Sequence, residues 1–395
     1  MKARIGWTAL ALSLLGAWTA ACSSEPAPPC GGPRVLCTVA GDGEGAQGTL
    51  GVPMAQVSLY QPMDVSFDDE GMAYLVDWNN HRILRVGADD RVEAWLGNGE
   101  IGEGLPIGKA TEAAIYHPTD VVFRPEGGAF VALWHNDVVV SIDVQGELKG
   151  VVGTGDVGYA PDGELAATAP VYLPSKLAMR PDGRLCFSEA GNQRVRCVDA
   201  LGRLETLVGP ASGPACVAES CVGKLRQPGF GGDGGPAGAA ALAMPHGNSA
   251  VPSGGLVFRP DGALLLADTL NHRVRRVDGG GTISTVAGGG DGKASQLGDG
   301  GLATAATLLR PSDVAVDGAG RLYIADTYHH CVRRVGIDGV ISTVAGRCGQ
   351  SGDAGDGGPA TAGLLNKPYG IAVDAAQRLW IADTLNHKIR RVEFD

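Results

Sequence analysis

Residues 256–288 read LVFRPDGALLLADTLNHRVRRVDGGGTISTVAG, and this pattern recurs twice further along the chain. Residues 314–346 read VAVDGAGRLYIADTYHHCVRRVGIDGVISTVAG, and residues 371–392 read IAVDAAQRLWIADTLNHKIRRV. Self-similarity at a fixed spacing indicates a repeat architecture in which each unit is one small supersecondary element. The rest of the 395-residue chain is therefore expected to follow the same unit.

Turn residues divide each repeat into four short apolar segments. In the copy at 314–346 these segments are too short for helices, and the last two flank Asp338-Gly339, a tight hairpin signal. The repeat therefore predicts four antiparallel strands that form one small sheet. Such a sheet cannot bury both of its faces alone, so we expect a closed ring of like sheets, which is a β-propeller.

Counting the repeats gives the number of blades. The first three segments occur six times, and a fourth follows in the first five copies. The segment missing from the last copy is at the other end of the chain, at Val35–Gly41. We therefore predict an all-β, six-bladed propeller over residues 35–395, closed by an N-terminal strand that completes the last blade and removes a free sheet edge. The first three strands are expected at 65–86, 121–142, 177–198, 256–277, 314–335 and 371–392.

The amino terminus indicates export. Lys2 and Arg4 precede an apolar run and small residues, as in a secretory signal peptide, here expected over 1–21. The cysteine after Ala20-Ala21 resembles a bacterial lipobox, which implies lipidation of Cys22; Thr19 stands where that motif usually has Leu, and ordinary cleavage is the alternative. Proline-rich residues 22–34 are expected to be a tether. The protein is then an outer-membrane or cell-surface lipoprotein, or alternatively periplasmic or secreted.

Composition limits the partners. The net charge of −11 argues against nucleic acid, and a lipid anchor is the only membrane contact that we expect. With 44% hydrophobic residues the chain has enough apolar material for a folded core, and we expect a monomer.

Eight cysteines remain besides Cys22, an even number for an exported chain. Their positions around predicted hairpins and loops suggest disulfides, with free buried thiols as the alternative. A metal site is less expected because the chain has no Cys-x-x-Cys pair. The expected pairs are Cys186–Cys197, Cys331–Cys348, Cys216–Cys221 and, as the remainder, Cys30–Cys37.

The Ile-Ala-Asp-Thr-x-x-His pattern, with Asn-His-Arg at 271–273 and Asn-His-Lys at 386–388, resembles the NHL repeat family over about residues 35–395. The Gly-Asp-Gly-Gly loops at 231–237, 298–301 and 356–360 resemble those of bacterial and teneurin-type NHL propellers. The resemblance implies the propeller fold and says less about function, because a fold does not define a site. Blade 2 departs from the pattern with Leu133 and Asp137, and blade 3 with Glu189 and Gln193.

The loops between the second and third strands of each blade are expected to share one face with the long links between blades. We call this the long-loop face and expect binding there. The recurring aspartates of these loops are expected to be structural, accepting bonds from the backbone N–H groups of their own loops, with a ring around a cation as the alternative. The recurring histidines are expected to be structural through packing and loop bonding, with metal binding as the alternative. These residues are Asp77, Asp268, Asp326, Asp383, His81, His272, His330 and His387. The candidate binding residues are Trp78, Trp134, His135, His246, Tyr328 and His329.

Two functions are consistent with these features. The first is a binding scaffold without cofactor, which presents the long-loop face to a protein, peptide or glycan. The alternative is an enzyme, because NHL-like propellers resemble peptidyl-amidoglycolate lyase and gluconolactonase-type hydrolases, which hold a metal ion such as Zn²⁺ or Ca²⁺ in the central channel. No catalytic or metal-binding set can be assigned to this sequence, so the binding function is preferred.

Overall fold

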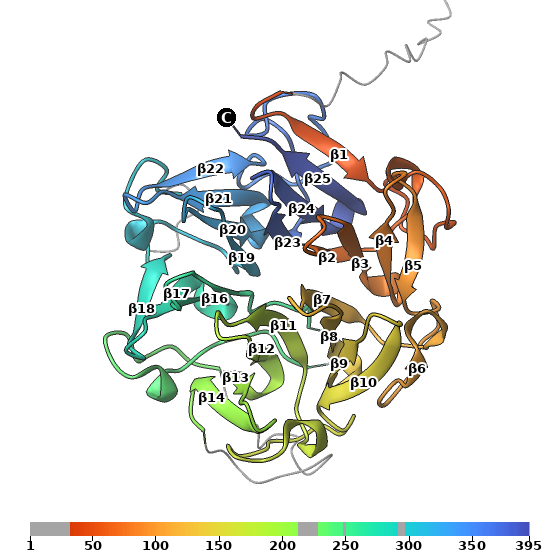
Figure 1. Ribbon diagram of the computed structural model, residues 1–395. Helices are drawn as coiled ribbons and strands as arrows, with labels where there is room; N and C mark the ends of the chain where they lie inside the picture. Colours follow the sequence, from red (N-terminus) through yellow and green to blue (C-terminus); the bar gives the residue numbers. More distant parts are fainter. Residues whose placement is uncertain (1–31, 212–227, 248–249, 291–296, 395) are drawn as a thin grey trace, which may run out of the picture.

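The computed structural model describes residues 32–211, 228–247, 250–290 and 297–394. Six antiparallel sheets surround a central axis, as Figure 1 shows, which confirms the predicted six-bladed propeller. From the axis outward, blade 1 is β2 (Pro62–Phe67), β3 (Ala73–Asp77), β4 (Arg82–Val86) and β5 (Val92–Leu96). Blade 2 is β7 (Pro118–Phe123), β8 (Ala129–Leu133), β9 (Val138–Ile142) and β10 (Glu147–Val152).

The other four blades repeat this order. Blade 3 is β11 (Pro174–Met179), β12 (Leu185–Glu189), β13 (Arg194–Val198) and β14 (Leu204–Val208). Blade 4 is β15 (Leu256–Phe258), β16 (Leu264–Asp268), β17 (Arg273–Val277) and β18 (Ile283–Ala287). Blade 5 is β19 (Asp313–Val316), β20 (Leu322–Asp326), β21 (Cys331–Val335) and β22 (Ile341–Ala345). Blade 6 is β23 (Pro368–Val373), β24 (Leu379–Asp383), β25 (Lys388–Val392) and β1 (Leu36–Ala40).

The ring closes as predicted. Strand β1 pairs antiparallel with β25, with Leu36 opposite Val392 and Thr38 opposite Arg390. Figure 1 shows this N-terminal strand on the outside of the last blade, next to the C-terminus. The pairing supplies the fourth strand of blade 6, so every blade has at least four strands.

Apolar side chains fill the spaces between neighbouring blades. Between blades 4 and 5, for example, Leu265 and Val274 of one sheet lie in the same buried cluster as Val314 and Ile324 of the next. Each blade therefore buries its faces against its neighbours, as the repeat predicted.

Blade 2 has an additional strand that the sequence did not indicate. The two-residue β6 (Gly108–Lys109) pairs with the outer strand β10, with Lys109 opposite Glu147. The ammonium of Lys109 lies 2.6 Å from the carboxylate of Glu147, so this pair of exposed charges covers the sheet edge.

The long links between blades run along the outer rim. In the link from blade 4 to blade 5, Gly288 N–H donates to Ala303 O at 3.0 Å, and Ala303 N–H donates to Gly339 O in the outer turn of blade 5 at 2.9 Å. Ala303 is buried in the short 3₁₀ turn η10 (Ala303–Ala305), and η1 (Met54–Gln56), η3 (Ala110–Glu112), η5 (Ala166–Thr168) and η8 (Ala237–Ala239) occupy equivalent places. We had expected the links to build the long-loop face. Much of each link instead joins neighbouring blades.

Disulfides join Cys186 to Cys197 and Cys331 to Cys348. The first links directly paired residues of β12 and β13, whereas Cys348 lies just beyond β22 and is not a cross-strand partner of Cys331. Cys37 is also disulfide-bonded. Cys22, Cys30, Cys216, Cys221 and the predicted signal peptide lie outside the described residues. Within the described part of the chain, no helix has the length and apolar character needed to cross a membrane.

Candidate functional site

The loops between the second and third strands share one conformation. Each forms a 3₁₀ turn: η2 (Trp78–Asn80), η4 (Trp134–Asn136), η6 (Ala190–Asn192), η9 (Thr269–Asn271), η11 (Thr327–His329) and η12 (Thr384–Asn386). Each turn ends at a left-handed residue: His81, Asp137, Gln193, His272, His330 or His387.

The recurring aspartate joins this loop to the strands beneath it. In blade 4, Asp268 accepts the backbone N–H of Ala243 at 2.8 Å and the side-chain amide of Asn271 at 2.9 Å. Its other oxygen lies 3.0 Å from the guanidinium of Arg275, and both side chains are fully buried. Arg275 also pairs with Asp233 of the Gly-Asp-Gly-Gly loop at 2.7 Å. The aspartate and this glycine-rich loop are thus two ends of one ionic network, which is buried at Asp268 and Arg275 and exposed at Asp233.

Blade 2 shows that the two charges of this network belong together. Blades 5 and 6 repeat the pairing through Arg333 and Arg390, whereas blade 2 has Leu133 in place of the aspartate and Val140 in place of the arginine. Losing either charge alone leaves the other buried without a partner. The paired replacement supports a structural role for the recurring aspartates.

The recurring histidines connect neighbouring blades. His330 Nδ1 accepts the backbone N–H of Lys367 at 3.1 Å, and His272 Nδ1 accepts that of Arg310 at 3.0 Å. This bond requires an unprotonated Nδ1, and burial lowers the pKa of both imidazoles. In blade 3, Gln193 replaces the histidine, and its Oε1 accepts the backbone N–H of Met244 at 2.6 Å.

The residues held in this way form a rim around the axis. Each directly precedes a proline at the start of an innermost strand or two residues before it, and has a left-handed backbone, which is unusual before proline. The hydrogen bond from the neighbouring blade fixes this conformation. The rim residues are Gln61, His117, Leu173, Arg310 and Lys367.

A cavity of about 250 Å³ opens at the centre of the long-loop face, and we call it the axial mouth. Met63, Val251 and Leu385 provide apolar lining, and the rim contributes Gln61, His117 and Lys367. Among the described residues that line the mouth there is no carboxylate, and Lys367 is the one side chain that carries a permanent charge. The other lining residues are Trp78, Tyr116, His135, Ala250, Tyr369 and Thr384.

Aromatic and imidazole rings form one wall of the mouth. The ring of His117 stacks on Trp78 with centroids 4.1 Å apart. His117 Nε2 lies 3.1 Å from Asn79 Oδ1 and therefore donates, so Nδ1 accepts from His135 Nδ1 at 2.7 Å. Burial, followed by the neighbouring His135, lowers the pKa of His117 to about 3. The Trp78–His117 stack is therefore flat and neutral at physiological pH.

Basic groups lie on the opposite side of the mouth. The guanidinium of Arg310 and the ammonium of Lys367 lie 4.8 and 4.5 Å from the ring centre of Tyr328. Burial raises the pKa of this phenol, but the hydrogen bond from Tyr369 and these two cations outweigh burial and lower it. Tyr328 is thus in a locally positive environment.

Beneath the mouth, charged side chains close the channel. The equivalent buried position at or near the start of each innermost strand is Asp64, Asp120, Lys176, Gly255, Asp313 or Gly370 in blade order. The ammonium of Lys176 bonds to Asp64 and lies 3.2 Å from Asp313. Burial raises the pKa of Asp64 to about 7 and that of Asp313 to about 6.

The glycines of this ring are required by the close packing. A Cβ at Gly255 would lie 2.1 Å from Asp313 Oδ1, and one at Gly370 would lie 2.3 Å from Met63 O. Within the described part of the chain, no group of three or more His, Cys, Asp or Glu side chains is arranged to hold a metal ion.

The structure separates the candidate binding residues into three groups. Trp78 and His135 line the mouth and Tyr328 lies beside it, whereas His246 is exposed and near Gln193. Trp134 was expected on the surface but is completely buried, packed with Leu173 and Val195. His329 is also buried, because it replaces the loop asparagine and bonds to Asp326 at 2.9 Å. Sequence reasoning did not identify the rim residues, although all five directly precede a proline near the start of an innermost strand.

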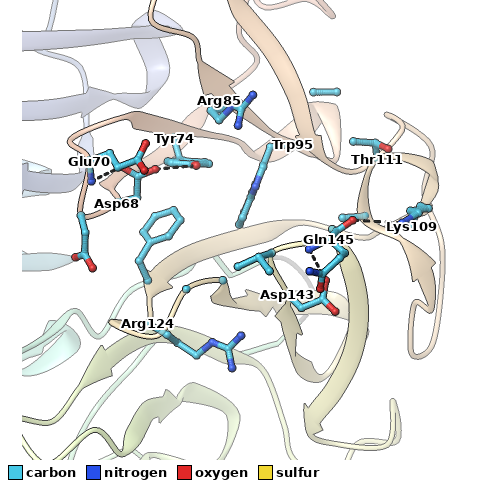
Figure 2. Close-up of a pocket in the computed structure, with 18 of the residues that line it drawn as sticks. Asp68, Glu70, Tyr74, Arg85, Trp95, Lys109, Thr111, Arg124, Asp143 and Gln145 are labelled. Atoms are coloured by element: carbon cyan, nitrogen blue, oxygen red, sulfur yellow. Dashed lines mark hydrogen bonds between the residues drawn. The ribbon is translucent and has the colours of Figure 1, made fainter.

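A larger cleft, of about 650 Å³, lies at the opposite end of the interface between blades 1 and 2. Figure 2 shows Tyr74 and Trp95 of blade 1 facing it, with Arg124 and Asp143 of blade 2 on the other side. Two of its cations have acidic partners: Arg85 bonds to Glu93 at 2.7 Å, and Lys109 to Glu147 at 2.6 Å. The axial mouth, in contrast, keeps its cations without acidic partners among the described residues.

Comparison with known proteins gives the same architecture. The family model described as NHL repeat matches residues 308–335. The chain is 22% identical over 299 residues to Protein SUPPRESSOR OF QUENCHING 1, chloroplastic, of Arabidopsis thaliana, covering 74% of this chain and 26% of that protein. It is 24% identical over 383 residues to Teneurin-m of Drosophila melanogaster, covering 91% of this chain and 13% of that protein. The chain thus spans about a quarter or less of these relatives.

Solved structures resemble the propeller at low identity. An auxiliary nutrient binding protein from Bacteroides thetaiotaomicron superposes with a TM-score of 0.60 at 16% identity, covering 90% of this chain and 75% of that one. A putative gluconolactonase gives a TM-score of 0.53 at 11% identity, covering 93% of each chain. Identities this low establish the fold alone.

Proposed function

The chain is an NHL-repeat β-propeller, and from this premise we propose that it is an exported binding protein, anchored by lipid on Cys22, whose axial mouth holds a protein, peptide or glycan. The observation that carries the proposal is the mouth itself. It combines a neutral wall of stacked rings, an apolar floor and unpaired cations on rigid loops. Such a combination of aromatic anchors and few polar groups suits ligand recognition.

Two further observations support this function. The disulfides Cys186–Cys197 and Cys331–Cys348 are typical of an oxidising compartment outside the cytoplasm. A structural neighbour is described as an auxiliary nutrient binding protein, and a ligand-binding role for this propeller accords with that.

The channel residues do not fit the metal ion that the enzymatic alternative requires. The position where carboxylates from three blades converge is already taken by the ammonium of Lys176, which bonds to Asp64 and is buried with it. A divalent cation placed there would be repelled by this fixed positive charge. We therefore propose no metal-dependent reaction for the channel.

Binding at the mouth is tested with residues 23–395 on peptide and glycan arrays. Trp78→Ala should reduce binding of any ligand found by at least tenfold, because it removes the ring on which His117 stacks. Trp95→Phe is the matched control, because Trp95 lies in the cleft at the opposite end of the blades. Equal binding by the Trp78→Ala variant and the wild type would refute the proposal.

Anchoring and metal binding are tested separately. Full-length protein expressed with a labelled fatty acid should carry the label and lose it in Cys22→Ala; an unlabelled wild-type protein would refute the anchor. Added Zn²⁺, Ca²⁺ or chelator should leave Tm unchanged, since a bound ion would raise it.

A further inference from the structure

The charge of the axial mouth is opposite to that of the whole molecule. The chain has a net charge of −11, yet no described residue lining the mouth is a carboxylate. Lys367 lines the cavity, and Arg310 lies beside Tyr328 at its edge. A local positive field in an acidic protein attracts an anion to that one place.

These two cations differ from the other basic groups nearby. Arg275 and Arg333 are buried in ion pairs with aspartates, at 2.7 and 2.6 Å for their shortest contacts. Arg310 and Lys367 form no ion pair with any described residue; both lie over the ring of Tyr328, and Arg310 also hydrogen-bonds to the side chain of this tyrosine. Their charge therefore remains available to a ligand.

The backbone at these two cations is rigid. Both are left-handed residues before a proline, and each N–H is bonded to an imidazole of the preceding blade. Little backbone entropy is lost when a ligand binds to side chains on such a frame.

The rest of the cavity suits an apolar group. Met63, Val251 and Leu385 line it, and the Trp78–His117 stack forms the flat wall. A sugar hydroxyl placed against Met63, Val251 or Leu385 would have no hydrogen-bond partner in that side chain, and burying an unbonded hydroxyl is costly. A carboxylate joined directly to an apolar side chain matches both sides of the mouth.

We infer that the axial mouth binds the carboxy-terminal residue of a peptide or protein, with Lys367 and Arg310 on the carboxylate and the Trp78 wall on an apolar side chain. This inference rests on the proposed binding function and specifies its ligand.

The test compares N-acetyl-phenylalanine with N-acetyl-phenylalaninamide, which differ only in the charge of the terminal group. In calorimetric titrations of residues 23–395, the acid should bind at least tenfold more tightly than the amide. Lys367→Gln and Arg310→Gln should each weaken binding of the acid by about tenfold and leave the amide unchanged, as expected for loss of one charge-assisted hydrogen bond. Lys149→Gln, on an exposed position of β10, is the matched control and should change neither.

Three results would overturn the inference. They are equal binding of acid and amide, a preference for the acid that survives in the double Lys367→Gln, Arg310→Gln variant, and no binding of the acid at about 10 mM. Tighter binding of digalacturonate than of the peptide acid would assign the cations to an acidic sugar instead.

Failure of this inference can be distinguished from failure of the proposed function. If array ligands without a carboxylate lose binding in Trp78→Ala but not in Lys367→Gln, the mouth binds ligands and only the anion assignment is wrong. If neither substitution affects any array ligand, the proposed function itself fails.

Discussion

Replacing Lys176 by methionine tests whether this side chain is the fixed cation of the channel. The ammonium bonds to Asp64 and lies 3.2 Å from Asp313, and all three side chains are at most 7% exposed. Methionine keeps most of the side-chain volume and removes only the charge. The variant therefore leaves the buried carboxylates without their counter-ion.

The expected loss of unfolding free energy follows from proton uptake by one of these carboxyl groups. Without Lys176, an aspartate whose usual pKa is 3.8 stays protonated in the folded protein at pH 7, which costs about 1.4 kcal/mol per pH unit and so about 4 kcal/mol. This agrees with the about 3–5 kcal/mol typical of breaking a buried ion pair. At pH 5 the same step costs only about 1.6 kcal/mol, by the same relation.

The sign of the pH dependence is fixed by the raised carboxyl pKa values. Asp64 titrates at about 7 and Asp313 at about 6 in the folded protein, so the native state binds more protons than the unfolded state above pH 3.8. Stability then falls as pH rises through this range, and removing Lys176 extends the fall to higher pH. Because the wild-type carboxyl groups are themselves partly protonated near pH 7, the difference between wild type and variant should be about 4 kcal/mol at pH 8, about 2 kcal/mol at pH 7 and less than about 1 kcal/mol at pH 5.

Urea denaturation followed by circular dichroism at pH 5, 6, 7 and 8 measures this difference. Lys149→Met, on the exposed face of β10, should be neutral at each pH. Adding Asp64→Asn to Lys176→Met should recover part of the loss at pH 8, because one uncompensated carboxylate is removed. A difference below about 1 kcal/mol at pH 8, or one that does not vary with pH, would show that Lys176 is not the counter-ion.

Three further predictions concern the repeat itself. Asp268→Leu should cost about 3 kcal/mol, because the buried Arg275 keeps only its exposed partner Asp233, and adding Arg275→Val should recover much of this by reproducing the apolar pair of blade 2; a double-mutant cycle of unfolding free energies checks it, and additive losses would contradict it. The pKa of His330 is lowered in the folded protein, so the stability that its neutral imidazole contributes is present above about pH 6.5 and lost as pH falls. His330→Gln, which copies Gln193, should therefore lose less stability than wild type between pH 7 and pH 5, and parallel pH profiles would refute the assignment. Removing the Cys331–Cys348 disulfide with alanines should cost about 3 kcal/mol because it closes a loop of 17 residues; an unchanged Tm would show that the bond does not constrain the unfolded chain.

The fold could be predicted because its signals are local and repeated. Turn residues such as Asp338-Gly339 mark the hairpins, and the missing last strand is visible as Val35–Gly41. The structural role of the recurring aspartates was foreseen for a related reason, since one binding site seldom needs a residue from every blade. What was not foreseen is that their main partners are an arginine on the next strand and the N–H of a preceding link.

The site was harder to predict because it depends on how residues from distant blades meet. Trp78 and Trp134 occupy equivalent loop positions, but Trp134 is enclosed by Leu173 and Val195, while Trp78 is stacked on His117 at the mouth. Lys176 is an ordinary strand residue until blades 1, 3 and 5 are placed around one axis. No local sequence pattern predicts such contacts between residues of different blades.

The pairing of β1 with β25 has a consequence for the order of events during synthesis. Thr38 and its hydrogen-bond partner Arg390 are separated by 352 positions, so the ribosome makes one side of this seam first and the other last. Contacts between such distant segments form slowly, and an unpaired strand is prone to associate with other chains. The nascent protein must therefore keep Leu36–Ala40 away from wrong partners until Lys388–Val392 has been synthesised, and interruption anywhere upstream of Lys388 would yield an open, association-prone product.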